Sequence, residues 1–317
     1  MGAPNVELYC LQDIHMSYGR EPVLTGADLA VGRSSIWGLV GDNGSGKSTL
    51  LKILAGILRP ERGRFLAPQG NVRIGYMPEN CQWYPHLTGA QVLRYFARYT
   101  GADDKAQEAV LDRVGLWAAR DKKVRAYSKG MKQKLGLAQA IVGQPDLLIL
   151  DEPTNGLDPR GIADFYQILK ERVAAGAAVV LSSHLLAELD GRISHLALLR
   201  QGRIAVSGPS QELVQQADLP YRVVWRHQPG SNPQTAIDNA AQHGWSLSQN
   251  GEALEAALPA VDLQNFLHLL GTLDDALADI QIYPPKLEDF YLRTVAAPAR
   301  ANGRGHLTAA LQEGEPS

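Results

Sequence analysis

The sequence predicts an α/β fold in which a mostly parallel sheet is covered by helices on both faces. Two observations lead to this prediction. Apolar strands alternate with helical patterns along much of the first two thirds of the chain, and this alternation is typical of a parallel sheet. A long helical stretch, from about 85 to 143, interrupts the alternation, and we expect it to form a helical subdomain of its own.

The elements follow from the spacing of apolar residues along the chain. Residues 6–19 and 21–32 alternate between apolar and polar side chains like strands. Compact apolar runs predict further strands, and a period near 3.6 residues predicts helices. We expect strands at 35–41, 72–79, 146–153 and 177–184, and helices at 44–56, 88–99, 105–115, 128–143 and 160–176.

A second domain is predicted where the pattern changes, after about residue 218. Its expected order is β-α-β-β-α-β, with a hairpin around Asn250-Gly251, and this order is that of a ferredoxin-like domain. The segment from Ala296 onward is rich in Ala, Gly and Pro, which is typical of disorder. We therefore predict three regions, at 1–218, 219–295 and 296–317.

The composition excludes several classes of protein. The chain has 317 residues and a formal net charge of −2, so it lacks the basic excess typical of nucleic-acid binding. Its two cysteines, Cys10 and Cys81, lie far apart, which favours buried thiols in a reducing compartment over a disulfide framework. No signal peptide is visible, and no run approaches the roughly 20 apolar residues of a membrane span. We expect a soluble chain that needs another subunit to act at a membrane.

A phosphate-binding loop is predicted at 41–48. The sequence GDNGSGKS matches the pattern G-x-x-x-x-G-K-[ST] and lies between a predicted strand and a predicted helix. Glycines let backbone N–H groups turn toward phosphate oxygens, and the helix N-terminus adds partial positive charge. We expect Lys47 to bridge the β- and γ-phosphates of ATP and Ser48 to ligate Mg²⁺. The alternative is a glycine-rich turn before a helix. The candidate nucleotide-binding residues are Gly41, Asn43, Gly44, Ser45, Gly46, Lys47, Ser48 and Thr49.

Two carboxylates end the apolar strand LLILDEP. Asp151 is expected to hold Mg²⁺, directly or through water, because a carboxylate at the C-terminal end of a buried strand faces the ligand edge of such a sheet. Glu152 is placed to orient the attacking water or to accept its proton. Alone, such a pair would more often be a solvated loop. The phosphate loop earlier in the chain favours the catalytic interpretation.

With these motifs the chain resembles the ATP-binding subunit of an ABC transporter over about residues 6–215. The resemblance implies a P-loop NTPase cassette with a parallel-sheet core, an antiparallel β region and a helical subdomain. In that family the stretch YSKGM, here 127–131, is the signature motif, which caps the ATP held by a second copy in a head-to-tail dimer. Ser128 and the backbone of Gly130 would then contact the γ-phosphate across the interface.

The resemblance assigns four more positions. Tyr18 matches the aromatic that stacks on adenine, and Asp158 ends the loop NGLD that couples the two sites. His184 matches the switch histidine that reaches the γ-phosphate, although a lone histidine after a strand is usually unremarkable. Glu79 stands near the lid hinge, where the family's commonest residue is Gln, and the resemblance implies contacts with Mg²⁺ and water at this position. Lys129 and Met131 also depart from the commonest signature, in the manner of exporter-type subfamilies.

The sequence of the whole chain is similar to the sequences of ABC-2-type exporter ATPases. Within that group it most resembles the NosF family, which implies a polytopic NosY-like permease and a periplasmic NosD-like protein. The implied task is copper-site assembly of nitrous oxide reductase, and the implied location is the cytoplasmic face of the inner membrane, as a peripheral subunit. Two alternatives stay open: the ATPase of another ABC-2 exporter for a drug, lipid or polysaccharide, and a soluble ABC ATPase that acts on ribosomes or DNA.

The resemblance also predicts a docking segment for the permease at Pro78–Leu87. Trp83 and Tyr84 are large side chains of the kind that dominate interface energetics. The alternative is that both fill the core of the helical subdomain.

Overall fold

The computed structural model describes residues 8–68, 71–227, 234, 243, 245, 247–251, 253–271 and 277–296. These residues divide into two compact units, one that ends at Pro209 and one that begins at Ser210. The second unit starts with helix α7 (Ser210–Gln216), which packs against helix α10 (Leu287–Ala296) and whose following carbonyls accept hydrogen bonds from Arg293. The division therefore falls one helix before the boundary that we predicted after residue 218.

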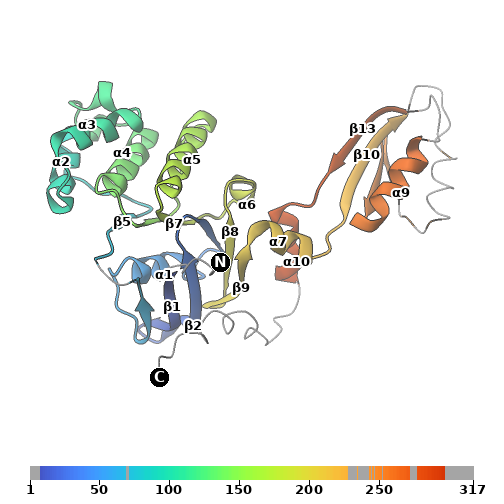
Figure 1. Ribbon diagram of the computed structural model, residues 1–317, viewed down its shortest axis with the longest axis horizontal. Helices are drawn as coiled ribbons and strands as arrows, with labels where there is room; N and C mark the ends of the chain where they lie inside the picture. Colours follow the sequence, from blue (N-terminus) through green and yellow to red (C-terminus); the bar gives the residue numbers. More distant parts are fainter. Residues whose placement is uncertain are drawn as a thin grey trace, which may run out of the picture. The chain divides into compact units, whose positions relative to one another are not determined.

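The central sheet of the first unit has the strand order β5-β6-β7-β3-β8-β9. Figure 1 labels β5, β7, β8 and β9 of this sheet. All neighbouring strands pair in parallel except β8 and β9, which form an antiparallel pair at one edge. Every residue of β3, β6 and β7 is buried, which explains their continuous apolar sequences. The predicted parallel sheet is thus confirmed, whereas β8 and β9 were not predicted. The bounds are β3 (Ile36–Val40), β5 (Ile74–Met77), β6 (Leu147–Leu150), β7 (Ala178–Ser182), β8 (His195–Arg200) and β9 (Arg203–Pro209).

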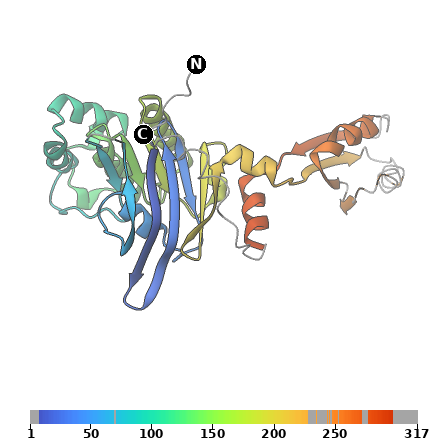
Figure 2. The ribbon, with the colours of Figure 1, turned by 60° about the horizontal axis from the view of Figure 1, so that its bottom comes forward.

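A second sheet, with the order β2-β1-β4, is antiparallel throughout and confirms the expected antiparallel region. Figure 2 shows its two long strands, β1 (Leu8–Tyr18) and β2 (Glu21–Gly32), side by side in blue. Strand β4 (Arg62–Leu66) completes it. Side chains from this sheet, from helix α1 (Lys47–Leu54) and from the central sheet form one hydrophobic core. Helix α1 is therefore held by packing on both sheets.

The predicted helical subdomain is confirmed between β5 and β6. It contains helices α2 (Gly89–Thr100), α3 (Asp104–Arg113) and α4 (Lys129–Ile141), with short 3₁₀ turns at Trp117–Ala119 and Val124–Ala126. Figure 1 shows α2, α3 and α4 gathered away from β1 and β2. Each helix begins at a side-chain cap, namely Thr88, Asp103 and Ser128. Helices α5 (Pro159–Ala174) and α6 (Leu186–Leu189) follow β6 and β7.

The second unit contains an antiparallel sheet with the order β11-β12-β10-β13, which is the strand order of a ferredoxin-like domain. Its own core includes Trp225, Trp245 and Phe266. The hairpin between β11 and β12 turns at Gly251, as expected. The first helix of the predicted β-α-β-β-α-β order, apart from single positions, and the predicted tail beyond Ala296 lie outside the described residues. The bounds are β10 (Tyr221–His227), β11 (Leu247–Asn250), β12 (Ala253–Leu258), α9 (Ala260–Gly271) and β13 (Leu277–Tyr283).

Both cysteines are free thiols, as the sequence predicts. Cys10 is buried and Cys81 is partly buried. Burial raises the pKa of the Cys10 thiol, and it raises the pKa of the Cys81 thiol to about 12. Because the thiolate is the reactive form, both side chains are inert apolar groups at neutral pH.

Candidate nucleotide-binding site

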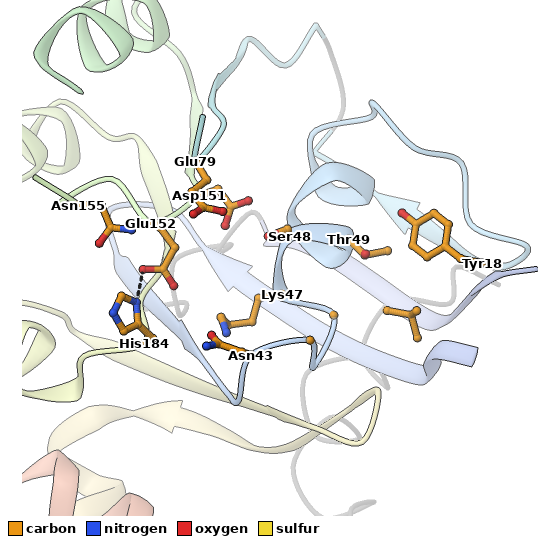
Figure 3. A pocket seen from close by; sticks show the side chains of 13 residues that line it. Tyr18, Asn43, Lys47, Ser48, Thr49, Glu79, Asp151, Glu152, Asn155 and His184 are labelled. Atoms are coloured by element: carbon orange, nitrogen blue, oxygen red, sulfur yellow. Dashed lines mark hydrogen bonds and ion pairs between the residues drawn. The ribbon is translucent and has the colours of Figure 1, made fainter. Parts of the chain in front are cut away.

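The predicted phosphate loop opens onto a cavity of about 520 Å³ at the C-terminal ends of β3, β6 and β7 (Figure 3). It is surrounded by residues of the antiparallel sheet, of α1 and of the loops after β3, β5, β6 and β7. In Figure 3, Tyr18 lies at one end and His184 at the other, with Lys47 and Ser48 between them. The lining residues are Tyr18, Val23, Asn43, Gly44, Gly46, Lys47, Ser48, Thr49, Glu79, Asp151, Glu152, Asn155 and His184.

Two glycines shape the loop between β3 and α1. A side chain at Gly41 would place its Cβ only 2.3 Å from the carbonyl oxygen of Leu199 on β8, so the close approach of these strands requires glycine. Gly46 caps α1 with φ of 101°, in the left-handed region that glycine adopts without strain. Its Cβ would also meet Val23 and Leu24 at 3.0 Å. Close packing against β8 and β2 therefore requires glycine at both positions.

The loop offers hydrogen-bond donors that fit a phosphate. The Lys47 ammonium donates to the carbonyl oxygens of Gly41, at 2.7 Å, and Asp42, at 3.1 Å, which leaves one N–H for a ligand. The Ser45 hydroxyl is buried and has no hydrogen-bond partner among the described residues. A buried polar atom without a partner costs free energy. Lys47, unlike Ser45, lines the cavity, so its remaining N–H is the donor available to a phosphate there.

The two predicted carboxylates meet the cavity from the end of β6. Asp151 is only 3% exposed, and Glu152 adopts φ of 47°, which is uncommon for a residue with a side chain. The Glu152 carboxylate lies 2.7 Å from Nδ1 of His184, which follows β7 (Figure 3). Sequence reasoning thus placed these three residues in one site, and the structure brings them together.

The charges that line the cavity are unequal. The carboxylates of Glu79, Asp151 and Glu152 face one ammonium, that of Lys47. Burial and the negative charge of Asp151 also raise the pKa of Tyr76 to about 12, so its phenol stays protonated at neutral pH. The carboxylates that line the cavity therefore outnumber its ammonium group, and a bound cation would offset the excess negative charge.

Five predicted site residues do not line this cavity. Gly41 and Ser45 lie in the loop behind it. The Ser128 hydroxyl accepts a hydrogen bond from the N–H of Met131 and caps α4, and the Asp158 carboxylate caps α5 through Gly161. A Cβ at Gly130 would lie 3.1 Å from the carbonyl oxygen of Gly156, so this glycine allows α4 to pack against the loop after β6. These residues have local structural roles in the single chain.

Val23 and Asn155 line the cavity although neither was predicted as a site residue. Asn155 lies in the loop NGLD, which the sequence did single out. Val23 lies on β2 and is an ordinary apolar strand residue, so nothing in its sequence context could have placed it in the site.

Comparisons with known proteins identify the family. A family model described as ABC transporter matches residues 24–155. The ABC transporter ATP-binding protein YdbJ of Bacillus subtilis, itself uncharacterized, is 38% identical over 205 residues, which cover 61% of this chain and 67% of YdbJ. This chain belongs to the ABC transporter ATP-binding proteins.

Further likeness agrees with this assignment. The Nod factor export ATP-binding protein I of Cupriavidus metallidurans is 34% identical over 218 residues, covering 64% of this chain and 72% of that protein. The solved structure of an ABC transporter ATP-binding subunit matches with a TM-score of 0.62 at 28% identity, over 74% of this chain and 99% of that one. The first unit is thus an ABC cassette with the P-loop NTPase fold, and the chain is an ATPase of this type. Within the part of the chain that the structure describes, none of the helices is long and apolar enough to cross a membrane.

We expect the Lys47→Ala variant to bind ATP roughly 10- to 100-fold more weakly, because a charge-assisted hydrogen bond to phosphate is lost. Titration of the full chain with a fluorescent ATP analogue measures this change. Lys52→Ala is the matched control, since Lys52 lies on the same helix and does not line the cavity. Equal affinities in the two variants would contradict a phosphate contact by Lys47.

Proposed function

We propose that this chain is the ATP-hydrolysing subunit of an ABC exporter, and that it binds ATP with Mg²⁺ in this cavity to power a separate membrane permease. The observation that carries the proposal is the meeting of Lys47, Ser48, Asp151, Glu152 and His184 around one cavity in a member of this family. The likeness to a Nod factor export ATP-binding protein supports the export direction.

The residues present fit Mg²⁺. Ser48, Asp151 and Glu79 offer a hydroxyl and two carboxylates, and oxygen ligands of this kind suit the ion. No described group of three or more His, Cys, Asp or Glu side chains could hold a metal by itself, so the phosphates of the nucleotide would complete the coordination. Bound there, the ion would neutralise charge that develops on the transferring phosphoryl group.

The chain's own residues would divide the remaining work. Lys47 and the loop amides hold the phosphates, and Glu152 orients the attacking water or accepts its proton. His184 contacts the Glu152 carboxylate and lies at the end of the cavity opposite Tyr18 (Figure 3). Tyr18 is 51% exposed at the cavity mouth, where its ring can stack on adenine.

The Glu152→Gln variant tests the catalytic assignment. We expect it to bind ATP like the parent but to lose at least about 10²-fold in turnover, because an amide cannot accept the proton. Phosphate release and nucleotide binding are measured on the same preparation. Turnover close to that of the parent would contradict the role given to Glu152.

A second copy of the chain is the proposed partner for the signature motif. Ser128 is exposed at the N-terminus of α4 and does not line its own cavity, which supports a contact with the ATP of the other copy in a head-to-tail dimer. Asp158 and the loop before it would couple the two sites.

A mixed dimer tests this arrangement. When one copy carries Lys47→Ala and the other carries Ser128→Arg, a cap that acts in trans places both lesions on one ATP site and leaves the second site intact. When one copy carries both changes, each site receives one lesion. We therefore expect ATP-dependent dimers of the first kind to be more stable in size-exclusion chromatography. The opposite ranking would indicate a cap that acts within one copy, and equal stability would remove the support for the trans arrangement.

The proposed permease contact lies in the segment Pro78–Leu87. Tyr84 is 72% exposed, so it does not fill the core of the helical subdomain. Trp83 is partly buried, and its indole N–H donates to the side chain of Gln139 at 2.8 Å. Gln139 lies on α4, the helix that begins in the signature motif, so this bond links the segment to that helix. Movements of α4 would therefore be transmitted to a permease bound at this segment. The chain would then lie at the cytoplasmic face of the membrane as a peripheral subunit.

The finer proposal is a NosF-like role in copper-site assembly of nitrous oxide reductase, with a NosY-like permease and a NosD-like periplasmic protein. The sequence resemblance described above supports it. Export of another substrate is the alternative that the Nod factor relative favours. Action on ribosomes or DNA has less support, given the net charge of −2.

Deletion of the gene distinguishes these roles in a host that makes nitrous oxide reductase. We expect the deletion strain to produce the reductase without its full copper content, and the parent chain but not the Glu152→Gln variant to restore it. The copper content of the purified reductase is the readout. A fully loaded reductase in the deletion strain would leave the NosF-like role without support and favour another exported substrate.

A further inference from the structure

We infer that Ser182 is a positioning residue for ATP hydrolysis, because its hydroxyl holds both the Asp151 carboxylate and the backbone of Glu152. Ser182 is the last residue of β7, is fully buried and does not line the cavity. It acts on the reaction through its two neighbours, so the inference rests on the roles proposed for Asp151 and Glu152.

The register of the central sheet brings these residues together. Strands β6 and β7 pair in parallel with Leu150 beside Leu181. The residues that come next, Asp151 after β6 and Ser182 in β7, therefore also lie side by side. Neighbours in register point to the same face of a sheet. The Ser182 hydroxyl donates to Oδ1 of Asp151 at 2.7 Å and accepts from the N–H of Glu152 at 2.8 Å.

A hydroxyl is suited to this position because it both donates and accepts. The carboxylate of Asp151 can only accept, and the backbone N–H of Glu152 can only donate. Serine supplies one proton to the first group and a lone pair to the second. Alanine at 182 would remove the partner of both groups in a buried place, where an unsatisfied polar group is costly.

The bond to the Glu152 N–H has a second consequence. Glu152 adopts φ of 47°, a conformation that persists only where surrounding contacts fix it. The hydrogen bond to Ser182 is such a contact. It holds the bend that directs the Glu152 side chain into the cavity, where its carboxylate meets His184 (Figure 3). Ser182 thus contacts Oδ1 of Asp151 and the N–H of Glu152, and His184, two residues after β7, contacts Oε2 of Glu152.

A purely structural role for Ser182 is the competing explanation, since a buried serine with two hydrogen bonds also stabilises the fold. Ser35 provides a matched control within this chain. It is also buried, and its hydroxyl accepts from the indole N–H of Trp37 and donates to the carbonyl oxygen of Gly32. Ser35 precedes β3, at the opposite end of that strand from the phosphate loop.

The experiment compares Ser182→Ala with Ser35→Ala in the full-length protein. Steady-state ATP hydrolysis gives kcat and KM, and thermal unfolding gives stability. A fluorescent ATP analogue gives nucleotide affinity in the presence of Mg²⁺ and in EDTA. These measurements separate loss of positioning from loss of fold.

We expect kcat of Ser182→Ala to fall roughly 10- to 100-fold, the range typical when a group that orients a ligating carboxylate is removed. Its affinity for the nucleotide in EDTA should stay that of the parent, because the Lys47 loop is untouched. The gain in affinity on adding Mg²⁺ should shrink, since Asp151 loses its orientation. Ser35→Ala should lower the melting temperature and leave kcat unchanged.

Two results would overturn the inference. One is turnover by Ser182→Ala at the parent rate. The other is a joint fall of turnover, melting temperature and affinity in EDTA, which would mark damage to the fold. Glu152→Gln, measured alongside, separates this inference from the proposed function: parent-like turnover in that variant would reject the role of Glu152 itself. If Glu152→Gln loses turnover while Ser182→Ala keeps the parent turnover, only the role of Ser182 is wrong.

Discussion

The parallel, in-register pairing of β6, β7 and β3 is the constraint on which the candidate site depends. These strands end at the same edge of the sheet, and the residues that follow them are Asp151, Ser183 and Gly41. Every residue of the three strands is buried, so a slip of one residue would turn apolar side chains away from one face of the core and toward the other. The same packing that stabilises the sheet therefore fixes the distances among the groups at its edge.

The central sheet also fixes the backbone on both sides of the cavity, at the phosphate loop and at Glu152. On one side, Gly41 approaches the carbonyl of Leu199 too closely for any side chain, which locks the phosphate loop against β8. On the other side, the backbone N–H of Glu152 donates to the Ser182 hydroxyl at the end of β7, which holds the bend at Glu152. Groups that are fixed before a ligand arrives need little reorganisation when it binds, which is how an enzyme site gains electrostatic stabilisation.

The signature motif and the loop NGLD, which the family resemblance relates to the second copy, also have local structural roles in this chain. Ser128 caps α4, Asp158 caps α5, and Gln133 on α4 donates to the carbonyl oxygen of Asn155. These contacts join the signature helix to the loop that follows β6. A change of conformation at the carboxylates could therefore reach α4 through packed backbone, and α4 in turn contacts Trp83 through Gln139.

The sequence by itself determined the cassette, because its motifs depend on local chemistry. The phosphate loop needs glycines and a lysine at fixed spacing, and the carboxylates directly follow an apolar strand. A period near 3.6 residues likewise predicted the helices of the helical subdomain, since this signal is confined to a few turns. Tertiary structure decided what depends on distant segments: the edge strands β8 and β9, the place of Val23 in the cavity, and the division of the chain before α7. It also decided the role of Ser182, because a serine at the end of an apolar strand shows its partners only when the strands pair in register.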